Sequence, residues 1–122
     1  MYYIKETKEF GRGLYAATLG VEEGIIIERC ELIILNDSST RVANETSLRY
    51  YTFTYNKYQD CIVLGNGSLF NHADDANVAY HIAEYDGRKV MVFYANRKIE
   101  HNEQLFINYK ADAIVDIKEY GI

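Results

Sequence analysis

An amide and an imidazole stand side by side in the stretch "GSLFNHADDANVAYHI", where Asn71 and His72 interrupt an apolar, strand-like run and Asn77 follows. A buried Asn or His costs free energy unless it is hydrogen-bonded, although folded domains contain a few that are. One interpretation is therefore structural, a satisfied polar pair in the core. The other is a binding site, since an amide offers both donors and an acceptor to a polar ligand.

Two further features could take part in chemistry. The sequence "GRGLYA" places Gly11 and Gly13 on either side of Arg12. Because glycine has no side chain, the backbone here could approach a ligand closely, or the two glycines could simply form a turn. This is not the G-x-G-x-x-G phosphate motif, and no strand-to-helix pattern follows it, which argues against a dinucleotide site. Tyr109 closes the run "EQLFINY", but the chain has 12 tyrosines, and most tyrosines pack with a bonded hydroxyl.

Metal and disulfide chemistry find little support. Cys30 and Cys61 lie in apolar runs that predict buried thiols rather than a disulfide. Neither a CxxC pair nor two histidines at ligand spacing occur, so a structural zinc site has little support and we expect no metal site. The residues that remain as candidate ligands are His72, His81 and His101.

The elements that must position these residues are predicted to be short strands and turns. The run 25–35 predicts a strand, a bend or bulge, and a second strand, because Glu28, Arg29 and Glu31 break two β-branched stretches. Residues 49–65 and 79–95 each fit a hairpin, the second with the type I′ turn pair Asp86 and Gly87. The fold class is therefore mostly β.

One segment does not fit a strand. Residues 36–48 are the most polar part of the chain and predict a loop, in which Asp37 or Ser38 could cap a short helical turn.

Length and charge set further bounds. A chain of 122 residues predicts one domain, residues 1–122, and no apolar run approaches a membrane span or a signal peptide. We therefore expect a soluble intracellular protein without membrane contact. The formal charge of -5 argues against direct nucleic-acid binding. It favours encounter with a basic partner such as a lysine-rich tail, unless the acidic face is simply solvated.

Three motifs, in order, resemble those of the SET-domain protein lysine methyltransferases. "GRGLYA" is similar to the family's GxGL(Y/F)A, "LFNHADDAN" to its (F/I)NHSxxPN box, and "VFYANRKIEHNEQLFINY" to its (F/A)xRDIxxGEELxxxY segment. The motif-bearing region is about 8–109, and the chain most resembles the minimal stand-alone SET proteins of viruses and bacteria. The resemblance implies a β-clip of several short sheets with a knot-like C-terminal core.

The resemblance also implies an activity, the transfer of methyl groups from S-adenosylmethionine to a lysine of a protein or peptide partner, a histone tail among the candidates. In it, Tyr109 is the catalytic residue that lines the lysine channel. The implied cofactor-binding residues are Gly11, Arg12, Gly13, Asn71 and His72. The alternative is a non-catalytic SET-like module that binds a peptide or protein.

Two residues are expected at the substrate. Tyr51 falls where small family members place a channel aromatic, although it could equally be one cross-strand aromatic among several. Ile107 stands two positions before the implied catalytic tyrosine, where an aromatic in relatives helps decide how many methyls are added. A smaller aliphatic group there predicts room for repeated transfer.

Departures from the family pattern occur at Ala73, Ala76, Lys98 and the pair His101 and Asn102. Asn102 can still adopt the left-handed conformation of the usual glycine. The tail 110–122 has no cysteine, so no post-SET zinc cluster is expected. The channel is then closed by a second subunit, by nothing, or by apolar residues of the tail: Ile114, Val115, Ile117, Tyr120 and Ile122. An apolar tail that is left exposed favours a homodimer. The implied location is the cytoplasm, or the host nucleus for a viral or effector protein.

Overall fold

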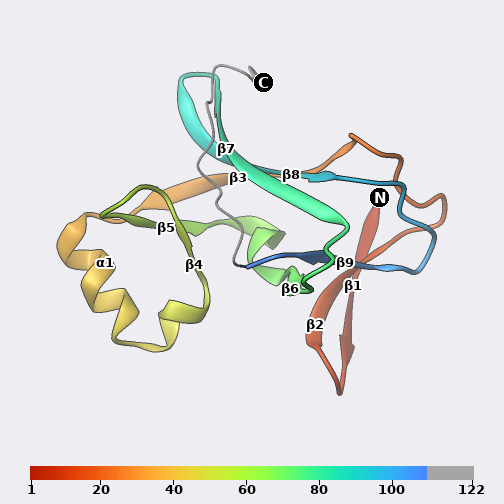
Figure 1. Cartoon of the computed structure of the whole chain (residues 1–122), viewed down its shortest axis with the longest axis horizontal. Helices are drawn as coiled ribbons and strands as arrows, with labels where there is room; N and C mark the ends of the chain where they lie inside the picture. Colours follow the sequence, from red (N-terminus) through yellow and green to blue (C-terminus); the bar gives the residue numbers. More distant parts are fainter. Residues whose placement is uncertain (110–122) are drawn as a thin grey trace. The chain divides into compact units, whose positions relative to one another are not determined.

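Strands make up most of the chain in a computed structural model that describes residues 1–109 (Figure 1). Two compact units can be recognised within the described residues. Unit 1 comprises residues 1–29, 69–80 and 92–109, and unit 2 comprises residues 30–68 and 81–91. The prediction of a mostly β fold is confirmed.

Unit 1 holds a four-stranded sheet in the order β1-β2-β9-β6. β1 (Tyr2–Thr7) and β2 (Gly11–Ala16) form the antiparallel hairpin seen in Figure 1, and β2 also pairs antiparallel with β9 (Gln104–Ile107). β6 (Asn71–His72) completes the sheet by pairing parallel with β9. This sheet therefore joins the three sequence motifs that were singled out above.

The second sheet has the order β4-β5-β3-β8-β7. Its strands are β4 (Thr52–Thr54), β5 (Asp60–Val63), β3 (Ile26–Ile34), β8 (Arg88–Ala95) and β7 (Val78–Tyr85). β4 and β5 pair antiparallel, and β7 is followed directly by β8, so strands form within both predicted hairpin segments.

The predicted bend within residues 25–35 is wrong, because β3 is one continuous strand of nine residues, while the alternative of a bulge in this run stays a prediction. Ile27 and Cys30 are buried along it, while the charged Glu31 is exposed. The Glu31 carboxylate accepts two hydrogen bonds from the guanidinium of Arg88, at 2.8 and 3.0 Å. A charge that is paired at the surface need not interrupt a strand.

The turn residues behave as their types predict. Asp86 and Gly87 have φ values of 51° and 77°, and a type I′ turn requires both to be positive. Asn102 has φ 69°, so it takes the left-handed conformation expected in place of glycine.

The predicted loop over residues 36–48 is wrong. α1 (Asp37–Asn44) and the 3₁₀ helix η1 (Ser47–Tyr50) occupy most of this segment. The N-cap is Asn36, one residue before the predicted caps, and its side chain accepts a hydrogen bond from the Ser39 backbone at 2.8 Å. Two residues of α1 are buried and give the short helix an inner face: Thr40 and Ala43.

The interior of unit 1 is apolar. Phe70 follows the 3₁₀ helix η2 (Gly65–Leu69) and stacks on Phe93 with ring centroids 4.5 Å apart. Other fully buried apolar residues of the same unit are Leu14, Val78, Ile99, Leu105 and Ile107. Burying one side chain of this size contributes about 1.5–3 kcal/mol.

Within unit 2, Cys30 and Cys61 are buried free thiols, which confirms the prediction. Burial, aided by the charge of Asp60, raises the pKa of Cys61 to about 12, so its thiol is neutral near pH 7. Among residues 1–109, no helix has the length and apolar character needed to cross a membrane.

Candidate functional site

A parallel strand pairing brings the amide and imidazole next to the segment that carries Tyr109. Asn71 lies opposite Phe106, and His72 lies opposite Ile107. Parallel neighbours cannot be joined by a tight turn, and the connection from β6 to β9 contains β7 and β8. Tyr109 follows the end of β9 by two residues and so lies beside β6.

Tyr109 is held through both its backbone and its hydroxyl. Its N–H donates to Nδ1 of His72 at 2.9 Å, and its hydroxyl donates to the carbonyl of Phe70 at 2.7 Å. The imidazole and phenol ring centroids are 5.1 Å apart. A hydroxyl whose hydrogen is directed at a carbonyl offers its oxygen lone pairs to another group. The Tyr109 side chain is thus oriented, while 55% of the residue stays exposed.

The hydrogen bonds of His72 define its tautomer. Because a backbone N–H can only donate, Nδ1 of His72 must be the acceptor for Tyr109. The neutral ring then carries its hydrogen on Nε2, which lies 2.8 Å from Oδ1 of Asp74 and donates to it. His72 therefore connects the loop after β6 to the segment after β9.

The Asn71 amide faces the first glycine motif. Its Nδ2 donates to the Arg12 carbonyl at 3.0 Å and to Oε1 of Gln104 at 2.9 Å. A Cβ atom on Gly13 would lie 2.6 Å from that Gln104 oxygen and 2.8 Å from Asn71 Nδ2. Both distances are too short for a side chain, so Gly13 leaves the space that the two amides fill.

Gly11 serves a different purpose from Gly13. Its φ of 66° is left-handed, and a Cβ there would meet nothing within 4 Å. It pairs with Thr7 at the end of the β1–β2 hairpin. The first glycine is therefore needed for backbone conformation and the second for space.

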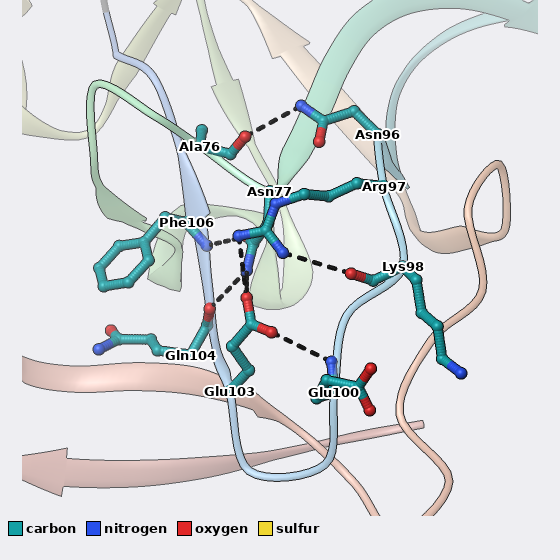
Figure 2. Close-up of polar contacts among 9 residues, drawn as sticks. All are labelled: Ala76, Asn77, Asn96, Arg97, Lys98, Glu100, Glu103, Gln104 and Phe106. Carbon is teal, nitrogen blue, oxygen red and sulfur yellow. Dashed lines mark hydrogen bonds and ion pairs between the residues drawn. The ribbon is translucent and has the colours of Figure 1, made fainter.

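Asn77, for which no role was predicted, is the buried centre of a polar cluster (Figure 2). Its Nδ2 donates to the Gln104 carbonyl at 2.8 Å and to Glu103 at 3.0 Å, while its Oδ1 accepts from the Phe106 N–H at 2.8 Å. These bonds fix β9 in the position that presents Gln104 to Asn71. The sequence feature that could have indicated this role is the position of Asn77 directly before an apolar strand.

Glu103 carries the charge of this cluster. Besides Asn77, it accepts a hydrogen bond from the Glu100 N–H at 3.1 Å and forms an ion pair with Arg97 at 3.0 Å (Figure 2). Burial raises the pKa of this carboxyl, but the hydrogen bonds from Asn77 and Glu100 and the charge of Arg97 outweigh burial and lower it. Glu103 is therefore ionised at neutral pH.

An open cavity of about 230 Å³ adjoins the histidine and tyrosine segments. Its lining residues include Asp74, Asp75, Tyr80, Asn96 and Asn108. The Tyr80 hydroxyl donates to the Asn108 carbonyl at 2.9 Å. The two carboxylates give the cavity a negative potential, which suits a cationic side chain.

The two other predicted site residues that the structure describes lie in unit 2 and in the interior of unit 1. Tyr51 belongs to unit 2, where it follows η1 and is 51% exposed, and its role stays a prediction. Ile107 is fully buried in unit 1. The tail residues proposed to close the channel (110–122) lie outside the described residues.

Comparisons with known proteins agree on one family. The sequence model of the SET domain matches residues 11–110. A Schizosaccharomyces pombe protein named histone-lysine N-methyltransferase, H3 lysine-37 specific, is 29% identical over 107 residues, which cover 87% of this chain and 71% of that protein.

Solved structures of similar fold include a Plasmodium falciparum protein assigned as a histone methyltransferase. It is 26% identical with a TM-score of 0.71, and the match covers 91% of this chain and 94% of the other. CpSET8 from Cryptosporidium has a TM-score of 0.73 at 19% identity, over 93% of this chain and 59% of the other.

Proposed function

The chain belongs to the SET-domain family of protein lysine methyltransferases, and we propose that it moves a methyl group from S-adenosylmethionine to a lysine side chain of a basic protein segment. The observation that carries this proposal is the meeting of Asn71, His72 and Tyr109 in one unit through the β6–β9 pairing. A polar pair that served the core alone would not need a half-exposed tyrosine beside it.

The residues around Asn71 fit the cofactor. Glycine at position 13 leaves room for the Asn71 amide, whose two N–H groups are directed at Arg12 and Gln104. The amide oxygen is then the atom that can accept a hydrogen bond from a ligand. When bound, S-adenosylmethionine supplies an electrophilic methyl group on a positively charged sulfur. We propose that the polar end of S-adenosylmethionine binds Gly11, Arg12, Gly13 and Asn71. The His72 backbone contributes to the same binding site.

Tyr109 is assigned to the lysine side of the reaction. A lysine amine must be neutral to act as a nucleophile, although its ordinary pKa is near 10.4. An aromatic, partly desolvated channel disfavours the ammonium form and so promotes loss of the proton. The Tyr109 oxygen, oriented by its bond to the Phe70 carbonyl, can then accept a hydrogen bond from the amine and hold its lone pair in line.

A basic protein segment is the substrate class that the charges support. The chain carries a formal charge of -5, and Asp74 and Asp75 line the cavity next to the histidine. Carboxylates at this place attract cationic side chains and speed encounter at low ionic strength. A histone tail has this character, and the S. pombe relative is named for a histone lysine.

The test begins with calorimetric titration of the purified protein with S-adenosylmethionine and with its demethylated product. We expect micromolar binding that is lost in Asn71→Ala and kept in Asn44→Ala, which removes an amide from α1 in unit 2. A lysine-peptide array read by mass spectrometry then identifies the acceptor. No binding at millimolar cofactor would contradict the proposal. Binding without turnover on any peptide would favour the non-catalytic module.

A further inference from the structure

The orientation of the Asn71 amide is fixed by partners whose roles are unambiguous. The Arg12 carbonyl can only accept, so the Asn71 atom 3.0 Å from it must be nitrogen. The Gln104 side-chain atom 2.9 Å from the same nitrogen must then be its oxygen. A backbone carbonyl thus sets the direction of both amides in turn.

This arrangement uses the whole donor capacity of Asn71. An amide nitrogen carries two hydrogens, and here they are directed at two acceptors, Arg12 O and Gln104 Oε1. Among residues 1–109, no group donates a hydrogen bond to Asn71 Oδ1. The Asn71 side chain therefore presents an acceptor to a ligand, and an acceptor selects a donor such as an ammonium group.

Gln104 is built into this position. It lies on β9 opposite Tyr15 of β2, and only 8% of it is exposed. Its backbone carbonyl accepts from Asn77, while its side-chain oxygen meets Asn71 in the space beside Gly13. One hydrogen bond to Arg12 would leave the Asn71 amide plane able to rotate, and the second bond, to Gln104, fixes that plane.

We propose that Gln104 is a positioning residue for cofactor recognition, because it holds Asn71 with Oδ1 directed at the α-ammonium group of S-adenosylmethionine. The inference rests on the proposed function, since it takes S-adenosylmethionine as the ligand. It assigns Gln104 no contact with the reacting atoms.

The test compares two ligands by calorimetry: S-adenosylmethionine and its analogue in which hydrogen replaces the α-amino group. Wild-type protein is expected to bind S-adenosylmethionine about tenfold or more tightly than the analogue, which is the effect of one hydrogen bond to a charged group. Gln104→Leu should weaken amine binding about tenfold and change binding of the analogue less than twofold. Gln104→Glu, which keeps an acceptor for Asn71 Nδ2, should retain the preference.

Two further measurements separate positioning from loss of structure. Gln59→Leu removes a half-buried glutamine amide from unit 2 and should leave both affinities unchanged. In protein without ligand, the Asn71 side-chain N–H resonances should exchange with water faster in Gln104→Leu than in wild type or Gln104→Glu.

The outcomes are distinguishable. A Gln104→Leu protein that keeps the preference for the amine, or that loses affinity equally for both ligands, overturns the assignment of Gln104 while the cofactor site stands. Wild-type protein that binds neither ligand overturns the proposed function and this assignment with it.

Discussion

The backbone N–H of Tyr109 donates a hydrogen bond to Nδ1 of His72, 37 residues earlier in the chain. This bond requires an imidazole nitrogen that accepts, so it is incompatible with the doubly protonated ring. The His72 side chain therefore has a role in addition to that proposed for the His72 backbone, because it positions the segment that ends in Tyr109.

Replacement of His72 should therefore lower methyl transfer through misplacement of Tyr109. We expect His72→Ala to reduce kcat about fivefold, the effect of losing one hydrogen bond of about 1 kcal/mol. His72→Asn can place its Oδ1 near the Nδ1 position and should recover much of the loss. Steady-state kinetics on the identified peptide measure both, and equal losses in the two variants would contradict this role.

Tyr109→Phe removes the hydroxyl that donates to the Phe70 carbonyl. If the oxygen orients the amine, kcat should fall about 100-fold, the lower range for a positioned catalytic group, with cofactor affinity unchanged. The matched control is Tyr3→Phe, which removes a hydroxyl bonded to Asn102 and should leave turnover within about twofold. Turnover by Tyr109→Phe at the wild-type rate would remove Tyr109 from the mechanism.

The two glycines of "GRGLYA" should respond differently to alanine. Gly13→Ala places a Cβ 2.6 Å from Gln104 Oε1, so we expect cofactor affinity to fall about tenfold or more as the amide pair is displaced. Gly11→Ala meets no atom but must take a φ of 66°, at a cost of about 1 kcal/mol in unfolding free energy. Calorimetry and urea unfolding of both variants give the comparison, and a Gly13→Ala protein with full affinity would show that the amide pair can move freely.

Asn77→Ala should be among the most destabilising single changes in unit 1. It leaves the Phe106 N–H and the Gln104 carbonyl without their partner, for a loss of about 3 kcal/mol in unfolding free energy. Asn96→Ala removes a nearby exposed amide that bonds the Ala76 carbonyl and should cost about 1 kcal/mol or less (Figure 2). Similar denaturation midpoints for the two variants would contradict the central role of Asn77.

The stability of the fold should fall as the pH drops below about 6.5. Burial lowers the pKa of His81 from its usual 6.5, so the unfolded chain binds a proton more readily than the folded one. The stabilisation is present above pH 6.5 and is lost as the pH falls toward the folded-state pKa. Urea unfolding between pH 7.5 and 5.5 should show a smaller decrease for His81→Gln than for wild type or for His101→Gln, an exposed histidine.

Helical structure shows where sequence patterns stop being informative. Residues 36–48 are polar enough to predict a loop, yet α1 forms because Asn36 caps it and Thr40 and Ala43 are buried on one side. These two residues are small, so the sequence pattern alone was too weak to predict a helix without knowledge of what the buried side packs against. In β3, a cross-strand ion pair with Arg88 compensates the charge of Glu31, one of the three charged residues from which an interruption was predicted.

The sequence by itself determined the family, the mostly β class and the identity of the candidate residues, because motif spacing, strand alternation and turn chemistry are local properties of the chain. Only the tertiary structure decided how those residues act on one another. The β6–β9 pairing joins Asn71 and His72 to residues more than thirty positions later, and Gly13 is explained by Gln104, which lies in a different motif. Hydrogen bonds between distant segments depend on which backbone groups the fold brings together, and no local pattern encodes that.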